Sequence, residues 1–277
     1  MPPDETALNQ PSGETVGSLR DWLAAARDHP RSCGLFCDVD GTLAPVVPRA
    51  DEARVPVEVS RLLGRLSAQL ALVACVSGRT AADAKRLVGV GGVVYAGAHG
   101  AELLNPATGE IERTPELEAW REPVQRFVSS LYSVELRRTG LRLEDKGFIQ
   151  ALHWRGAEEP DMAELLVAQI TDDAIAQGFE VHHGRKVLEI RPPVHFNKGI
   201  AVTRLVESYA ITHAAYVGDD LTDLDAFDAL RRLHENGALV TALCIGVASE
   251  EQPHRLVEAA DVMVNGPRGV TDLLQTI

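Results

Sequence analysis

The sequence predicts an α/β protein, a parallel sheet with helices on both faces, interrupted by an inserted α+β module. Short, wholly apolar runs recur along the chain, and each is followed by a polar or glycine-containing turn, a pattern typical of buried parallel strands. Segments with helical spacing lie between these runs. One stretch, between about Thr108 and Pro193, breaks the rhythm and contains paired short strands instead.

The first element, over Val16–His29, is an amphipathic helix, because its apolar residues repeat at helical spacing. Core strands are expected at Gly34–Val39, Leu70–Val76, Val93–Ala96, Ala214–Val217, Leu239–Val247 and Val262–Val264. Further helices are expected at Val57–Ser67, Ala81–Val88, Lys198–Tyr209, Asp223–Leu233 and Glu250–Ala259. Repetition of strand, turn and helix predicts a Rossmann-like sheet, in which the ligand site lies beyond the carboxyl ends of the strands.

The stretch that breaks the rhythm has the order αββαββ. Its elements are expected at Pro115–Val134, Gly140–Glu144, Phe148–Trp154, Asp161–Ala176, Phe179–His182 and Lys186–Arg191. The turn at 105–109 and the pair Pro192-Pro193 bracket it as hinges. We therefore expect a disordered lead at 1–15, a discontinuous core at 16–108 and 193–277, and an inserted domain at 109–192.

Charge and composition exclude several classes of partner. The net charge is −13 without a long basic cluster, which disfavours nucleic acid and anionic membranes. No apolar run approaches the roughly 18 residues of a membrane helix, and Met1–Glu14 lacks the features of a secretory signal. The four cysteines suit buried positions in a reducing compartment, and Cys33 and Cys37 lack nearby histidines for a zinc site. We expect a cytoplasmic protein.

Two carboxylates follow the first predicted core strand, in Asp38-Val-Asp40-Gly-Thr42. A carboxylate can attack phosphorus, and a second one two residues later can protonate the leaving oxygen and then deprotonate water. Asp38 is therefore the candidate nucleophile and Asp40 the candidate general acid/base, while Thr42 offers a hydroxyl to phosphate. The alternative is a tight turn with solvated aspartates.

A second acidic loop, with Asp219, Asp220, Thr222 and Asp223, follows a later strand. Mg²⁺ prefers one or two carboxylates with water and substrate oxygens. Asp219 or Asp220 could therefore share Mg²⁺ with Asp38, and the sequence leaves open which of the two is the direct ligand. The alternative is a helix N-cap, because Thr222 and Asp223 open a helix well, and the two roles are compatible.

Two further segments could bind phosphate. Ser77 and Gly78 combine a hydroxyl with backbone amides at a helix start, and Lys198 opens a later helix, where it can hold phosphate as a point charge. Taken alone, these segments are explained equally well by a plain turn and a solvated lysine. Together with the two acidic loops, they make a far more specific pattern.

With these four motifs the chain resembles the haloacid dehalogenase superfamily of phosphohydrolases. The resemblance implies that Asp38 is the nucleophile and Asp40 the general acid/base, and that Ser77 and Lys198 bind phosphate. It also implies that Asp219, Asp38 and the Asp40 carbonyl hold Mg²⁺, with Asp220 and Asp223 as supporting carboxylates. Aspartate at position 40, where ion-pumping relatives have threonine, favours a phosphatase.

Within this superfamily the chain resembles the trehalose-6-phosphate phosphatases, whose αββαββ cap lies between the serine and lysine motifs. The resemblance spans Leu35 to the C-terminus and rests on segments 38–45, 96–102, 144–147, 184–192 and 218–223. It implies sugar contacts from His99, Glu102, Lys146, Lys186 and Glu189. The alternatives are surface turns for the two lysines and an outer strand position for Glu189.

Three features of the sequence complicate this interpretation. Lys186 and Glu189 would point to opposite faces of a regular strand, so a bulge, or a strand beginning after Lys186, is needed. Leu224 stands where the family usually has a second acidic residue, which puts any role of that position in doubt. Histidines 153, 182 and 183 lack a carboxylate at ligand spacing and are interpreted as ordinary sheet residues rather than metal ligands.

The resemblance implies a Mg²⁺-dependent phosphoric monoester hydrolase that converts trehalose 6-phosphate to trehalose and phosphate through an aspartyl phosphate. Closure of the cap would exclude water, and Asp40, kept protonated by crowded carboxylates, would protonate the departing sugar oxygen. The alternatives are a phosphatase or mutase for another phosphosugar, such as sucrose phosphate or mannosylglycerate phosphate, and a non-catalytic sugar-phosphate sensor. We expect a monomer whose partner is a small phosphosugar, with a functional link to a separate trehalose-6-phosphate synthase.

Overall fold

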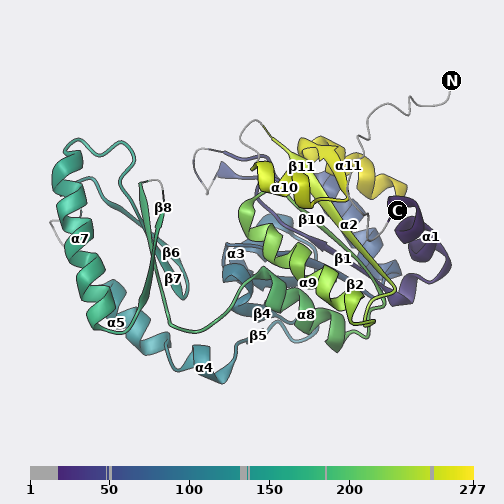
Figure 1. Ribbon diagram of the computed structural model, residues 1–277, viewed down its shortest axis with the longest axis horizontal. Coiled ribbons are helices and arrows are strands. Elements are labelled where there is room, and N and C mark those ends of the chain that lie inside the picture. The colour runs from purple at the N-terminus through teal and green to yellow at the C-terminus, as the bar shows by residue number, and fades with distance from the viewer. Residues whose placement is uncertain are drawn as a thin grey trace. The chain divides into compact units, whose positions relative to one another are not determined.

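The computed structural model describes residues 18–47, 49, 52–131, 136, 138–184, 186–249 and 253–277. The lead expected at 1–15 lies outside the described residues, as do the ends of three expected helices, at 16–17, 132–134 and 250–252. The chain divides into two compact units. One contains the described residues up to Glu112 together with Phe196–Ile277, and the other is Arg113–His195 (Figure 1).

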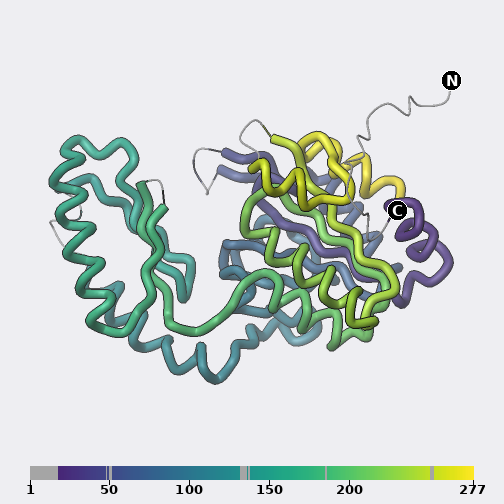
Figure 2. Tube along the Cα trace, in the orientation of Figure 1, coloured from purple at the N-terminus to yellow at the C-terminus, as the bar shows by residue number. Residues whose placement is uncertain are grey.

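The first unit is built on a mixed sheet with the strand order β12-β11-β10-β1-β2-β3-β4-β5. Its parallel strands are β1 (Cys33–Cys37), β2 (Leu72–Val76), β3 (Val94–Gly97), β10 (His213–Gly218), β11 (Thr241–Ala248) and β12 (Val262–Asn265). In Figure 2 the early and late parts of the chain lie side by side in this unit, because β1 pairs with both β2 and β10. The predicted α/β class is confirmed.

Helices cover both faces of this sheet (Figure 1). Those on one face are α1 (Leu19–Asp28), α2 (Val57–Gln69), α3 (Ala81–Val88) and α11 (Gly266–Thr276), and those on the other are α8 (Lys198–Ser208), α9 (Leu224–Glu235) and α10 (His254–Ala259). Successive residues of β1 point to opposite faces, so that Leu35 joins one buried cluster and Phe36 the other. Both faces of the strands are buried, which explains their unbroken apolar runs.

Two parts of this unit were not expected from the sequence. A hairpin of β4 (Glu102–Leu104) and β5 (Ile111–Glu112) extends the sheet antiparallel to β3. The turn at 105–109, expected as a hinge, joins these two strands. The C-terminal helix α11 was also missed, because Gly266 and Pro267 are typical of a loop, although proline is well tolerated in a first helical turn.

Within the described residues, the second unit contains an antiparallel sheet with the order β6-β7-β9-β8, together with helices. Its elements are α4 (Pro115–Glu118), α5 (Arg121–Leu131), β6 (Arg142–Lys146), β7 (Ile149–His153), α7 (Pro160–Ala176), β8 (Glu180–Gly184) and β9 (Val187–Arg191). Along β9, Leu188 and Ile190 are buried, whereas Glu189 alternates with them on the other face.

None of the described helices is long and apolar enough to cross a membrane. On α7, Met162, Leu165 and Ile175 are each more than half exposed, so the expected monomer stays a prediction.

Candidate active site

The two acidic loops of the first unit lie at the carboxyl ends of neighbouring strands. Asp38 directly follows β1, and its backbone N–H donates to the carbonyl of Val217 in β10. Asp219 directly follows β10. Because β1 and β10 are parallel and adjacent, both loops are brought to the same edge of the sheet.

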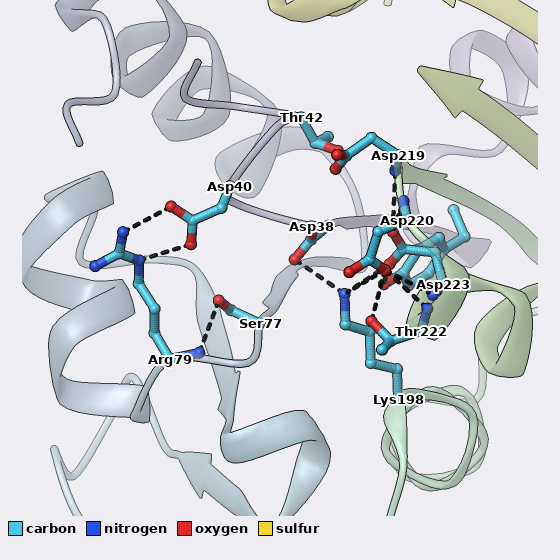
Figure 3. Close-up of polar contacts among 11 residues, drawn as sticks. Asp38, Asp40, Thr42, Ser77, Arg79, Lys198, Asp219, Asp220, Thr222 and Asp223 are labelled. Carbon is cyan, nitrogen blue, oxygen red and sulfur yellow. Dashed lines mark hydrogen bonds and ion pairs between the residues drawn. The ribbon is translucent and has the colours of Figure 1, made fainter. Parts of the chain in front are cut away.

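Lys198 lies between these loops at the first position of α8 (Figure 3). Its Nζ is 3.1 Å from Asp38 Oδ1 and 2.8 Å from Asp223 Oδ1. Its side chain is almost fully buried, as are both carboxylates. Asn197 caps the helix by accepting the N–H of Ile200, which fixes where α8 begins and therefore where the ammonium lies.

Asp223 organises this cluster through both of its carboxylate oxygens. Oδ1 accepts hydrogen bonds from Lys198 Nζ and from the Tyr216 hydroxyl, at 2.8 and 2.7 Å. Oδ2 accepts from the backbone N–H groups of Asp219 and Asp220, at 2.9 and 3.0 Å. The carboxylate that supports Lys198 therefore also fixes the backbone of the second acidic loop.

Asp219 and Asp220 have different surroundings. Asp219 accepts a hydrogen bond from the Thr42 hydroxyl at 2.9 Å, and a Cβ on Gly41 would come within 2.0 Å of Asp219 Oδ2. Asp220 instead caps the next helical turn, where its Oδ1 accepts from the backbone N–H and the hydroxyl of Thr222. The N-cap that the sequence offered as an alternative is thus formed by Asp220, and Asp219 is the carboxylate adjacent to Asp38.

The cluster holds more negative than positive charge. Burial raises the pKa of Asp38 well above its ordinary value, and burial together with the charge of Asp223 raises the pKa of Asp219 to about 7. Burial alone would lower the pKa of Lys198, but the charges of Asp223 and Asp38 raise it above its ordinary value. The lysine is therefore charged, and the carboxylates around it still lack positive charge.

Asp40 is not part of this cluster. Its two oxygens accept hydrogen bonds from Arg79 Nε and Nη2, each at 2.6 Å, and Figure 3 shows the pair lying apart from Lys198. The expectation that crowded carboxylates surround Asp40 is wrong, because the turn after β1 directs its side chain to the loop after β2. A side-on arginine pair of this kind holds a carboxylate in a fixed orientation.

Ser77 and Gly78 lie in the loop between β2 and α3, beside the segment that joins β3 to β4. Ser77 is buried, and its Oγ accepts the backbone N–H of Arg79 at 3.2 Å. His99 and Glu102 come from the neighbouring segment. Glu102 is 4% exposed, and its Oε2 accepts the backbone N–H of Ala81.

Similarity to known proteins identifies the family of this chain. Residues 36–259 match the model of the trehalose-phosphatase family. The chain belongs to the trehalose-phosphatase family. A trehalose-phosphate phosphatase of Mycobacterium avium is 36% identical over 210 residues, and one of Mycobacterium marinum is 31% identical over 271 residues. These matches cover 73% and 93% of this chain.

The chain spans 52% and 64% of the lengths of these two relatives. The solved C-terminal domain of the Candida albicans trehalose-6-phosphate phosphatase has the same fold, with a TM-score of 0.68 and 22% identity, over 98% of both chains. The architecture of a trehalose-phosphatase thus extends over nearly the whole chain.

In this trehalose-phosphatase chain, the second unit has a charged cluster of its own. On the face of the sheet opposite Leu188 and Ile190, Lys146 Nζ lies 3.4 Å from Glu189 Oε1 and 4.0 Å from Glu144 Oε2. His153 Nε2 lies 2.8 Å from the same Glu144 oxygen, and this hydrogen bond lowers the pKa of Glu144 to about 2. Two of the expected sugar-contact residues, Lys146 and Glu189, are therefore neighbours.

Lys186 is not part of that cluster. It forms an ion pair with Glu164 of α7, and its φ of 64° lies in the left-handed region. The strand β9 begins at Val187, which resolves the parity problem without a bulge. Among the described residues, Asp38, Asp219 and Asp223 form the one group of three side chains that could hold a metal ion. His153, His182 and His183 are not part of it.

Two residues of this candidate site were not predicted from the sequence. Tyr216 was placed in an apolar strand, and its hydroxyl gave no separate signal. Arg79 was given no role, although an arginine directly after Ser77-Gly78 lies within reach of the neighbouring acidic loop. Both are hydrogen-bond partners of aspartates that were predicted correctly to lie at this edge of the sheet.

Proposed function

We propose that the protein is a Mg²⁺-dependent phosphatase that hydrolyses trehalose 6-phosphate through an aspartyl phosphate on Asp38. The observation that carries the proposal is the buried contact of Asp38 with Lys198. A second carboxylate, Asp219, lies beside it and lacks a cationic partner of its own within this cluster, which has more negative than positive charge. A buried carboxylate next to one ammonium suits nucleophilic attack on a bound phosphate. Family membership supports the trehalose ester as the substrate.

The residues present fit Mg²⁺. Asp38, Asp219 and Asp223 each offer a carboxylate oxygen, and these oxygens lie within 4.8 Å of one another. Because both oxygens of Asp223 already accept hydrogen bonds, we assign Asp38 and Asp219 as the direct carboxylate ligands, with the Asp40 carbonyl beside them and Asp220 and Asp223 in support. When bound, Mg²⁺ would neutralise negative charge on the phosphoryl oxygens.

The proposed reaction has two steps. A carboxylate oxygen of Asp38 attacks phosphorus, the bond between phosphorus and the sugar oxygen breaks, and the departing oxygen takes a proton from Asp40. Asp40 then accepts a proton from the water that attacks the aspartyl phosphate, which releases phosphate and restores Asp38. Lys198 holds the phosphoryl oxygens against Asp38, with Ser77, Gly78 and Thr42 as further phosphate contacts.

The pair between Arg79 and Asp40 sets a condition on the first step. Both oxygens of Asp40 accept from Arg79, so one of these hydrogen bonds must open before that oxygen can carry a proton to the leaving group. Arg79 would then hold the other oxygen and keep the carboxyl group oriented. Lys146, Lys186 and Glu189 of the second unit, together with His99 and Glu102, are the sugar contacts that the family resemblance suggests.

The test is phosphate release from trehalose 6-phosphate, glucose 6-phosphate, sucrose 6-phosphate and mannose 6-phosphate, with and without Mg²⁺. We expect strong, Mg²⁺-dependent release from the trehalose ester alone. Release from another ester would retain the Asp38 chemistry and replace the substrate. Absence of release from every ester would contradict the proposal and favour a mutase or a sensor.

A further inference from the structure

The segment from Gly97 to Glu102, between β3 and β4, has an unusual backbone. Ala98 and His99 are consecutive non-glycine residues with φ values of 48° and 56°. Such left-handed conformations cost free energy, so they persist where surrounding contacts hold them. The contacts of this segment lead to both phosphate-binding motifs of the first unit.

On one side the segment holds the loop of Ser77. The backbone N–H of His99 donates to the carbonyl of Ser77 at 2.9 Å, and that of Ala98 donates to the carbonyl of Arg79 at 2.6 Å. The His99 ring lies directly beside Gly78, since a Cβ at that position would be 2.8 Å from Nε2. The left-handed turn is therefore what points these two N–H groups at the loop.

Glu102 continues this contact to the start of α3. Its Oε2 accepts the N–H of Ala81, the first residue of the helix, at 3.1 Å. Thr80 caps the helix by accepting the N–H of Asp83, so the two side chains satisfy different backbone donors. The approach is close, because a Cβ on Gly97 would lie 2.0 Å from the nitrogen of Ala81.

On its other side the segment touches the start of α8. A Cβ on Gly100 would lie 2.7 Å from the carbonyl oxygen of Asn197, the residue before Lys198. The segment thus lies between the Ser77 loop and the Lys198 helix start, and it contacts the backbone of each. Its position fixes the spacing between the two motifs.

We infer that Glu102 is a positioning residue, which holds the Ser77–Arg79 loop through the start of α3 rather than contacting the sugar. The inference rests on the proposed phosphatase function. The buried carboxylate of Glu102 already accepts the backbone N–H of Ala81 and so holds the loop before that residue. Through this loop it positions Ser77, which contacts the phosphate, and Arg79, which holds the acid/base Asp40. Loss of this acceptor leaves a buried N–H without its partner and frees the loop to move.

The experiment measures the affinity for inorganic phosphate by calorimetry of the full chain with MgCl₂, together with kcat and KM for trehalose 6-phosphate. Glu102→Gln keeps an acceptor of the same reach, whereas Glu102→Asp keeps the charge but withdraws the oxygen by one methylene group. We expect Glu102→Asp and Glu102→Ala to weaken phosphate binding and to lower kcat, each on the order of tenfold. The loss in Glu102→Gln should be several-fold smaller.

Asp261→Ala is the matched control. Asp261 is also a buried carboxylate that accepts a backbone N–H, from Cys244 at 2.8 Å, but it directly precedes β12, and β11 and β10 lie between that strand and β1. We expect this variant to lower the melting temperature and to leave phosphate affinity unchanged. A purely structural role of Glu102 would give the same result as this control.

The inference is overturned if Glu102→Asp and Glu102→Ala bind phosphate as the unmodified protein does while KM for the phosphosugar rises, because that result indicates a sugar contact. Absence of phosphate binding by the unmodified protein would overturn it as well. The unmodified protein could bind phosphate more tightly than the Glu102 variants and still release none from any ester. That result would support the inference and contradict only the proposed function.

Discussion

The chain has two lysine–carboxylate clusters, one in each unit, and they differ in burial and in charge balance. Lys198 and its partners Asp38 and Asp223 are almost fully buried, with further carboxylates nearby. Lys146 and Glu189 are each about one-fifth exposed, and Glu189 also forms an ion pair with Arg191. The first cluster suits the binding of further positive charge and phosphate, whereas the second is a balanced polar surface.

The pKa values of Asp219 in the first cluster and of Glu144 in the second shift in opposite directions. That of Asp219 is raised to about 7 by burial and by Asp223, whereas that of Glu144 is lowered to about 2 by its hydrogen bond with His153. The raised pKa thus follows mainly from burial, and the lowered one from a hydrogen bond to the charged form. The same residue types therefore have different chemical capacities in the two units.

The largest effect is expected from Asp38→Asn, which removes the proposed nucleophile. Turnover should fall at least about a thousandfold, because a neutral amide does not attack phosphorus. The melting temperature should stay the same or rise, since the substitution removes a buried negative charge from a site with too many. Phosphate release and thermal unfolding measure the two effects, and retention of more than a tenth of the rate would refute the assignment of Asp38.

The comparison of Lys198→Met with Lys146→Met tests the difference between the clusters directly. Loss of Lys198 leaves two buried carboxylates uncompensated, which should cost about 3–5 kcal/mol of unfolding free energy. Loss of Lys146 breaks partly exposed pairs, for which about 1 kcal/mol or less is expected. Urea unfolding of both variants gives the two values, and equal losses would contradict the distinction drawn above.

Tyr216→Phe removes one of the four hydrogen bonds to Asp223 while keeping the aromatic packing against Phe227. A hydrogen bond to a charged group is worth about 1.5–3 kcal/mol, and a neutral one about 1 kcal/mol. The control is Tyr95→Phe, because that buried hydroxyl bonds to neutral backbone groups: it donates to the carbonyl of Val90 at 2.7 Å and accepts the N–H of Val90 at 3.2 Å. We expect the larger loss of stability, and a fall in kcat, only for Tyr216→Phe. A larger loss for Tyr95→Phe would count against a charged Asp223.

The smallest effect on stability is expected when the pH is lowered. Because the pKa of Glu144 is lowered in the folded protein, its stabilising contribution is present above the unfolded pKa of about 4.5 and is lost as the pH falls towards 2. After solvent screening this amounts to about 1 kcal/mol or less. Carbon-13 NMR of the Glu144 carboxyl group should show a midpoint near 2, returning towards 4.5 in His153→Gln. An unchanged midpoint in that variant would remove His153 as the cause.

Much of the candidate site in the first unit could be predicted from the sequence, because the patterns that indicate it are local. Asp38 and Asp219 each follow an apolar strand, and Lys198 opens a helix after an N-cap, so topology alone brings them together. The pairing of Arg79 with Asp40 was not accessible, since it depends on the direction of a side chain after a tight turn. The role of Tyr216 was hidden for a similar reason, because a buried hydroxyl has no sequence pattern.

The two hairpin strands of the first unit were missed because they are short. The strands β4 and β5 have three and two residues, too few for an alternating pattern to be recognised. The positions of Glu102 and Lys186 could not be predicted either, because each depends on residues with positive φ nearby, Ala98 and His99 in one case and Lys186 itself in the other. Backbone conformations of this kind are decided by packing rather than by local preference.

The strand that carries Asp38 lies between β2 and β10, and Cys33 of β1 is in register with His213. During synthesis on the ribosome, β1 and β2 emerge long before β10, and the whole of Arg113–His195 is translated in between. One edge of β1 therefore stays without its partner strand for most of the time that the chain is being made. Unpaired edges of this kind are where nascent chains associate wrongly, so the central position of the nucleophile makes this protein dependent on late, long-range pairing for a correct yield.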